Sequence, residues 1–412
     1  QMNKMYILSV TLLLFSCTKT EIKEVEVERI VTNTLTETVT VTNTIVIAPE
    51  EYSFTRNGVS TVYYTGQTSR LKMATELKSA MNNLSSNQVG IDNMFNQGKG
   101  FSDSSLDASG KKVGNKTAAS PIASATVKPM FDAWITEFTT VVIPAVNDDI
   151  TASSGVAGSY TEADGSRTVK VNAKGFELNQ IFSKGLIGAL QIDQIVNGYL
   201  SFSKLDGAKQ DHDDDVYAYT FPGQTEPSIT KMEHYWDEGF GYLQGLDNQF
   251  TSGLGDPSIG RDTANLNYYL NKVNKQANEA GITDRIYNAF TIGRAAIVAK
   301  DFDQRDRQAA IIASELSKVI GYKSQSYLRD AAEDIENGDW ADALHALSEA
   351  YGFILGLQFT KTSDGSPYLS NQGVNELLNE LSAGTGGFWQ RTPDELTAMA
   401  DQLEQITGLT LE

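Results

Sequence analysis

Two of the three histidines in the chain begin the same thirteen-residue pattern, H-x3-E-[GA]-[FY]-G-[YF]-[LI]-x-G-L, at His234 and at His345. Residues four apart lie on one face of a helix, so each copy predicts an imidazole beside a carboxylate. The pairs are His234 with Glu238 and His345 with Glu349. An imidazole and a carboxylate together can ligate a metal or serve acid/base chemistry. The repetition itself predicts a duplicated fold.

The first copy is richer in metal ligands than the second. Asp237 lies three residues after His234, close to the same helix face, and with Glu238 it completes a set of one nitrogen and two carboxylates. Such a set suits zinc, iron or manganese. In the second copy a serine replaces the aspartate, which leaves His345 and Glu349 as secondary candidates. Neighbouring helices would have to supply the remaining ligands, as in metal sites inside helical bundles.

The repeated pattern also has a purely structural explanation. Each histidine can hydrogen-bond the glutamate one turn later while the aromatic residues of the pattern fill the core. Glycines recur four residues apart in both copies, at Gly241 and Gly245 and at Gly352 and Gly356. Glycine allows the backbones of two helices to approach closely. Helix packing and metal binding are therefore competing hypotheses for the same residues.

Other candidate sites are weaker. The segment 211–215 holds four aspartates around His212 and could bind calcium, but it lacks the ligand spacing of an EF-hand, and a solvated charge run is the alternative. No H-E-x-x-H, G-x-S-x-G or phosphate-binding loop sequence occurs in the chain. We therefore predict no catalytic residues.

The first residues read as a secretion signal. Lys4 precedes an apolar run from Tyr6 to Phe15, and the following Leu-Phe-Ser-Cys sequence resembles a bacterial lipobox ending at Cys17, the only cysteine. We expect residues 1–16 to be removed and Cys17 to carry a lipid. The apolar run is too short to span a membrane as a permanent helix. An ordinary cleaved signal with an incidental cysteine is the alternative.

The charge of the chain limits its partners. Asp and Glu number 52 against 33 Lys and Arg, which gives a formal net charge of -19. This charge opposes phosphate backbones, so we expect no nucleic-acid partner. Solubility of an exported protein explains the acidic balance without a cationic ligand.

Three parts follow the signal in the predicted organisation. Residues 17–51 are rich in Thr, Val and Glu with a period of two, which predicts an extended spacer with β tendency. The alternative is that this spacer adds a strand to the sheet of an envelope protein partner. Residues 52–412 exceed what one core usually holds. We expect two halves, 52–256 and 257–412, divided at the Gly/Pro-containing break 252–260.

The body is predicted to be mainly α, with one small β-hairpin at Asn57-Gly58. Residues 96–125 are predicted to form a long loop. The glycines at 185, 188 and 198 are expected to allow close packing of a central helix. Helices are expected from an N-cap at Ser69, over about 127–146 and 177–203, from Ser228, and over about 263–279, 284–300, 303–337, 340–358, 371–381 and 392–406.

A lipobox, a spacer, the sequence YSFTRNGVSTVYYTGQTSRLKMATEL and a late HYWDEGFGYL resemble the DUF4856 family of Bacteroidota lipoproteins, which is related to imelysin-like proteins. The resemblance covers Tyr52 to the C-terminus. It implies duplicated imelysin-like helical bundles, an envelope location and a link to iron acquisition. The imelysin signature G-x-H-x-x-E is associated with a metal site and a peptidase label. His234 matches its histidine, but Met232 replaces its glycine and Asp237 its glutamate.

These observations predict a non-enzymatic, lipid-anchored protein of the cell envelope, on the outer membrane. Its expected ligand is a divalent metal such as iron or zinc, haem, or another iron-linked ligand. Its predicted ligating residues are His234, Asp237 and Glu238, with His345 and Glu349 secondary. One alternative is a zinc metallopeptidase in which Glu238 activates water. The other is a surface scaffold in which both repeats only pack.

Overall fold

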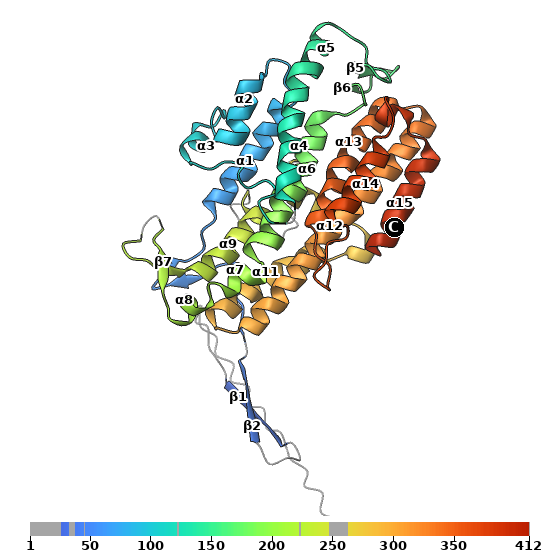
Figure 1. Cartoon of the computed structure of the whole chain (residues 1–412). Helices are drawn as coiled ribbons and strands as arrows, with labels where there is room; N and C mark the ends of the chain where they lie inside the picture. The colour runs from blue at the N-terminus through green and yellow to red at the C-terminus, as the bar shows by residue number, and fades with distance from the viewer. Residues whose placement is uncertain are drawn as a thin grey trace, which may run out of the picture.

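The structure is a computed structural model that describes residues 26–32, 38–44, 46–121, 123–221, 224–246 and 263–411. The predicted signal peptide and Cys17 lie outside these ranges, as does the predicted division between residues 256 and 257. Most described residues are helical, and the strands within these ranges form only two-stranded sheets (Figure 1). The prediction of a mainly α fold is confirmed.

The spacer contributes a pair of strands. Strands β1 (Glu26–Thr32) and β2 (Thr38–Thr44) pair antiparallel along their whole lengths. This hairpin extends away from the helices in Figure 1. The described part of the spacer is therefore a β-hairpin, whereas the sequence predicted a single extended chain with β tendency.

A second hairpin lies at the start of the body. Strand β3 (Thr55–Arg56) pairs with β4 (Val59–Ser60) through a two-residue turn. The turn residues Asn57 and Gly58 have φ values of 54° and 79°, as a tight hairpin turn requires. The small hairpin predicted from Asn57-Gly58 is present.

The first helix begins earlier than predicted. Tyr64 is its N-cap, and Ser69 lies inside the helix, where its hydroxyl donates to the Thr65 carbonyl at 2.9 Å. The predicted central helix is observed as α6 followed directly by the π-helical segment η3. The elements of this part are α1 (Thr65–Ala80), α2 (Gln88–Asp92), η1 (Asn93–Gln97), α3 (Ser104–Ala108), α4 (Ser124–Glu137), η2 (Phe138–Val142), α5 (Ile143–Asn147), β5 (Gly158–Thr161), β6 (Thr168–Val171), α6 (Leu178–Leu186), η3 (Ile187–Tyr199), α7 (Phe202–Asp206), α8 (Lys209–Asp213), β7 (Tyr217–Tyr219), β8 (Ile229–Thr230) and α9 (Lys231–Gln244).

The helices after residue 263 follow the sequence pattern closely, except that α10 is shorter than predicted. The long helix α12 begins where the Asp301 side chain accepts a hydrogen bond from the Gln304 N–H at 2.9 Å, and it ends at Gly338, whose φ is 85°. The elements are α10 (Leu266–Val273), η4 (Ala277–Glu279), α11 (Ile282–Val298), α12 (Phe302–Asn337), α13 (Trp340–Gly356), η5 (Leu357–Phe359), α14 (Asn371–Leu381), η6 (Gly387–Gln390) and α15 (Pro393–Thr407).

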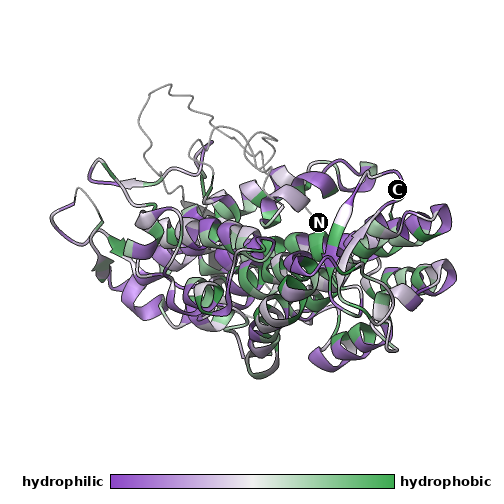
Figure 2. Ribbon diagram, turned by 90° about the horizontal axis from the view of Figure 1, so that it is seen from above, coloured by the Kyte–Doolittle hydropathy of each residue, from purple (hydrophilic) through white to green (hydrophobic). Residues whose placement is uncertain are grey.

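One apolar core runs through the helical body. Helix α12 packs against α11, α13 and α15, and α13 packs against α6. Hydrophobic residues lie between the helices and hydrophilic ones face outward (Figure 2). Since α6 precedes the predicted division and α13 follows it, the core spans both predicted halves. Within the described ranges, no helix has the length and apolarity needed to cross a membrane.

The repeated glycines lie at two helix crossings. Gly352 on α13 lies against Lys184 and Gly185, and a Cβ on Gly356 would lie 3.3 Å from the Cα of Gly188. Gly241 on α9 lies against Tyr64 in the same way, at the start of α1. Both copies of the pattern therefore use glycine to bring a second helix close, as the packing hypothesis predicts.

Candidate functional site

Helix α9 carries the first copy of the pattern and has a well-defined start. The Thr230 hydroxyl accepts from the Glu233 N–H at 3.3 Å, and the Glu233 carboxylate accepts from the Thr230 N–H at 2.9 Å. This reciprocal capping box satisfies two backbone donors that the first turn would otherwise leave free. It fixes the position of His234, which directly follows Glu233.

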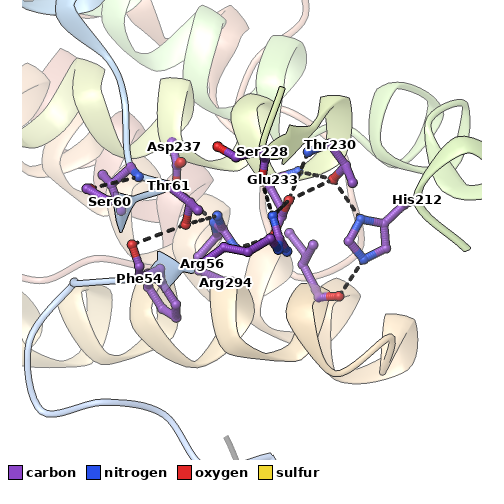
Figure 3. Close-up of polar contacts among 12 residues, drawn as sticks. Phe54, Arg56, Ser60, Thr61, His212, Ser228, Thr230, Glu233, Asp237 and Arg294 are labelled. Atoms are coloured by element: carbon purple, nitrogen blue, oxygen red, sulfur yellow. Dashed lines mark hydrogen bonds and ion pairs between the residues drawn. The ribbon is translucent and has the colours of Figure 1, made fainter. Parts of the chain in front are cut away.

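Asp237 faces the protein interior. Its Oδ1 accepts a hydrogen bond from the Tyr52 hydroxyl at 2.6 Å and another from Arg294 Nε at 3.0 Å. Arg294 Nη1 lies 3.1 Å from Glu233 Oε1, and Arg56 Nη2 lies 2.9 Å from the same oxygen (Figure 3). We call these five residues the Arg294 cluster. The cluster is a structural ion-pair network that joins α9 to α11 and to the N-terminal hairpin.

The pKa values of the two carboxyl groups in the Arg294 cluster are shifted in opposite directions. Complete burial raises the pKa of Asp237 to about 7, and Arg294 only partly opposes this. Burial acts on Glu233 as well, but Arg294 and Arg56 outweigh it and lower the pKa of Glu233 to about 2. The cluster therefore holds Glu233 ionised, and Asp237 carries a buried Oδ2 without a hydrogen-bond partner.

His234 and Glu238 lie at a surface cavity. Their closest side-chain atoms, Nε2 and Oε2, are 3.9 Å apart. Glu238 Oε1 accepts from the Gln67 amide at 2.8 Å. We call the cavity the His234 pocket; it has a volume of about 310 Å³, and its walls include Tyr63, Gln67, Ser69, Lys111, His234 and Glu238.

The imidazole of His234 is enclosed by aromatic rings. The ring centroid of Tyr219 lies 4.4 Å away and that of Phe221 5.4 Å away. Burial lowers the pKa of His234, although Glu238 and the Tyr63 carbonyl favour the charged form. Nδ1 is buried and has no hydrogen-bond partner. The result is a neutral imidazole that borders the pocket and has one buried nitrogen without a hydrogen-bond partner.

The second copy has the same internal geometry but different surroundings. His345 Nε2 lies 3.9 Å from Glu349 Oε1, the separation seen in the first copy. Here, however, His345 Nδ1 lies 2.6 Å from Glu177, and Glu349 lies 3.0 Å from the buried Lys184 ammonium. Burial opposes ionisation of Glu349, but Lys184 and then His345 lower its pKa. The histidine Nδ1, which has no hydrogen-bond partner in the first copy, is thus bound by a protein carboxylate in the second.

Ser348 explains the departure from aspartate in the second copy. Its hydroxyl accepts from the Glu177 N–H at 2.9 Å and so fixes the start of α6. The residue at this position is structural in both copies, since Asp237 likewise binds protein groups. Glu177, Lys184 and Ser348 thus link the second histidine helix to α6.

The predicted ligands do not converge on a single metal position. Asp237 contacts Tyr52 and Arg294 in the Arg294 cluster. Of the three predicted ligands, only His234 and Glu238 lie beside each other. Within the residues that the structure describes, no three His, Cys, Asp or Glu side chains are grouped to hold a metal ion. Binding of a metal by His234, Asp237 and Glu238 therefore stays a prediction.

The acidic segment 211–215 forms most of helix α8 and the turn after it. Its carboxylates meet lysines: Asp211 lies 2.8 Å from Lys231, and Asp213 lies 2.7 Å from Lys209. Asp215 lies 3.1 Å from another lysine, Lys300. These pairs neutralise the charge run locally, and they favour the alternative to calcium binding.

His212 in the same segment is buried and bonded at both ring nitrogens. Nε2 lies 2.7 Å from the Ile297 carbonyl, and Nδ1 lies 2.7 Å from the Thr230 hydroxyl (Figure 3). A neutral ring that donates from Nε2 and accepts at Nδ1 satisfies both partners. Burial lowers the pKa of His212, so the charged form is disfavoured in the folded protein.

This burial predicts a pH dependence of stability. A histidine whose folded pKa is below its unfolded value contributes stability that is complete above about pH 6.5 and is lost as the pH falls below that value. The free energy of unfolding of wild type should therefore fall relative to that of His212→Asn between about pH 7.5 and 5.5. Denaturant titrations of both proteins measure this difference, from which the opposite contribution of Asp237 cancels. An equal pH dependence in the two proteins would contradict it.

Several residues of the site were not singled out from the sequence. Arg294 and Lys184 are isolated charges within the apolar segments AFTIGRAAIV and NQIFSKGLIGAL, and that isolation was an available signal of a buried ion pair. Lys111 lies in a segment that the sequence predicted only as a loop. No local pattern connects it with His234, which is distant in the sequence.

The fold and site together define a helical protein with two equivalent histidine–glutamate helices, one sealed by protein groups and one open to a pocket. The family model described as "Domain of unknown function (DUF4856)" matches residues 49–410, so the chain belongs to this family. No curated protein matches the chain. No solved structure matches it either.

Proposed function

We propose that this protein is a lipid-anchored, non-catalytic binding protein of the cell envelope that takes an iron-linked ligand in the His234 pocket. The contrast between the two copies carries the proposal. In the second copy Glu177 and Lys184 contact the histidine and the glutamate, whereas in the first copy Nδ1 of His234 has no hydrogen-bond partner and the His234 side chain lines a cavity. The histidine that protein groups leave without a partner is therefore the better candidate for binding a ligand.

The donor set limits the form in which a metal can arrive. One imidazole nitrogen and one carboxylate fill two positions, and structural zinc or ferric sites need at least four. A metal that already carries a small chelator requires only one or two donors from the protein. Because burial lowers the pKa of His234, its imidazole is neutral near pH 7 and can ligate without losing a proton.

The envelope location rests on the N-terminal sequence. A lipid on Cys17 would attach the chain to the outer membrane, and residues 18–51 would separate the helical body from the bilayer. The β1–β2 hairpin in that spacer offers strands to which an envelope protein partner can add. The family resemblance to imelysin-like proteins favours an iron-linked ligand over others.

A binding comparison tests the proposal. The purified full chain is titrated with ferric citrate, free iron and zinc, and bound metal is measured by elemental analysis. His234→Ala should weaken ferric citrate binding by at least about tenfold, the loss that follows removal of even an outer-shell partner. His345→Ala is the matched control and should leave the affinity unchanged, since Glu177 already occupies that ring.

Two results would overturn the proposal. Equal binding by wild type and His234→Ala would remove the site. Absence of metal from all three proteins, with unchanged helicity, would make both repeats packing elements and favour the surface-scaffold alternative. A peptidase would require metal-dependent cleavage, and the described residues provide no third ligand to support it.

A further inference from the structure

We propose that the His234 pocket binds an anionic oxygen group, a carboxylate or a phosphate, through Lys111. This deepens the proposed function, from which it takes only that the pocket is a ligand site. Four features support it: an unpaired lysine, a helix start without a side-chain cap, further cations close to that lysine and the size of the cavity.

Lys111 lies over the first turn of α1. A Cβ placed on Gly66 would lie 2.9 Å from Lys111 Cε and 3.4 Å from its ammonium nitrogen, so glycine leaves the space that this side chain uses. Among the described residues, Lys111 has no carboxylate within ion-pair distance and no side-chain hydrogen bond. The ammonium instead borders the His234 pocket.

The start of α1 is electrostatically unusual. Its N-cap, Tyr64, makes no side-chain capping hydrogen bond, and its first turn contains no acidic residue. The positive end of a helix macrodipole favours an anion and disfavours a cation. Lys111 over Gly66 therefore adds positive charge where negative charge is favoured. An anion bound between Lys111 and the start of α1 would compensate the charge of the lysine and the positive end of the helix dipole.

Other cations increase this positive potential. Burial lowers the pKa of Lys116, and so does repulsion from Arg70, Lys204 and Lys111, while Glu238 alone opposes them. None of these four cations forms an ion pair with a described carboxylate. Of these groups, Lys111 and Glu238 line the His234 pocket, and Arg70, Lys116 and Lys204 lie outside its walls.

The four cations have other contacts that leave their charge uncompensated. Arg70 Nε donates to the Lys112 carbonyl at 2.9 Å. The ammonium groups of Lys116 and Lys204 lie 5.5 and 4.9 Å from the ring centroid of Tyr199. Glu238 is the opposing charge, and its Oε1 already accepts from the Gln67 amide. An anionic ligand would compensate the positive charge of these side chains.

The cavity sets the size of the ligand. A volume of about 310 Å³ equals roughly ten water molecules at ~30 Å³ each. A small organic acid or a phosphate group fits this space. Carboxylate chelators of iron fall in this size class, which joins the anion site to the proposed function.

Metal-free anions test this inference separately. Citrate and inorganic phosphate are titrated calorimetrically into the purified full chain, with metal removed by chelation. Lys111→Met should raise the dissociation constant of the bound anion at least about tenfold, because the variant loses the charge-assisted contact. Lys112→Met is the matched control and should bind like wild type, because the Lys112 ammonium contacts Gln97 at 3.3 Å.

The outcomes are distinguishable from those of the metal experiment. His234→Ala should lose ferric citrate binding but keep binding of metal-free anions. Citrate binding without phosphate binding identifies the group as a carboxylate, and the reverse identifies a phosphate. Raising ionic strength should weaken binding, as the Debye length shortens from ~30 Å at 0.01 M to ~8 Å at 0.15 M. Failure of both anions to bind wild type, or equal binding by Lys111→Met, would overturn the inference even if metal binding is found.

Discussion

An Arg294→Met protein should be less stable than wild type by about 3–5 kcal/mol. Arg294, Glu233 and Asp237 have fully buried side chains, and Arg294 contacts both carboxylates. Methionine fills part of the same volume but leaves Asp237 with only the Tyr52 hydroxyl and Glu233 with only Arg56 as a charged partner. Glu233 then loses one of its two charged partners, and Asp237, whose pKa is already raised, must take up a proton to stay buried; these two costs are the reason for the large effect. Urea titration should show a lower midpoint with an unchanged denaturant slope.

Two further variants distinguish lost charge from lost packing. Arg329→Met removes an exposed ion pair with Asp401 and Glu404 and should change stability by no more than about 1 kcal/mol. Adding Glu233→Gln and Asp237→Asn to Arg294→Met should recover part of the loss, because neutral groups tolerate burial better than ions. A triple variant no more stable than Arg294→Met would contradict the electrostatic explanation.

The helices were predictable because their signals are local. Apolar spacing and capping residues placed α11 to α15 within a few residues of their observed bounds. The start of α1 was misplaced because Ser69 can bond a backbone carbonyl within a helix as well as cap one. The glycine spacing correctly predicted close crossings. At a close crossing a side chain on the helix would collide with its neighbour, so glycine recurs at the same positions of both copies.

The site was only half predictable from the sequence. The spacing of four correctly placed His234 beside Glu238, and His345 beside Glu349, at 3.9 Å in each copy. Asp237 contacts the Tyr52 hydroxyl and Arg294 from α11, and no local spacing of residues predicts these contacts. The pairing of a loop lysine with the start of α1 depends on tertiary structure alone.

The glycine contact between η3 and α13 gives the second large effect. Gly188→Ala should destabilise the protein by about 1–3 kcal/mol, the usual cost of overpacking. The added methyl would lie well inside van der Waals distance of the Gly356 Cα, which is backbone and cannot rotate away. Alanine otherwise stabilises a helix by up to about 1 kcal/mol relative to glycine, so any net loss must come from packing.

Gly198→Ala is the matched control for this substitution. Gly198 lies on the same helical segment, but a Cβ there would lie no closer than 3.6 Å to its neighbours. That variant should be as stable as wild type or more stable. Thermal and urea unfolding of the two variants compare the glycines directly. If Gly188→Ala were as stable as Gly198→Ala, the helices could separate without loss, and the repeated glycines would need an explanation other than close crossing.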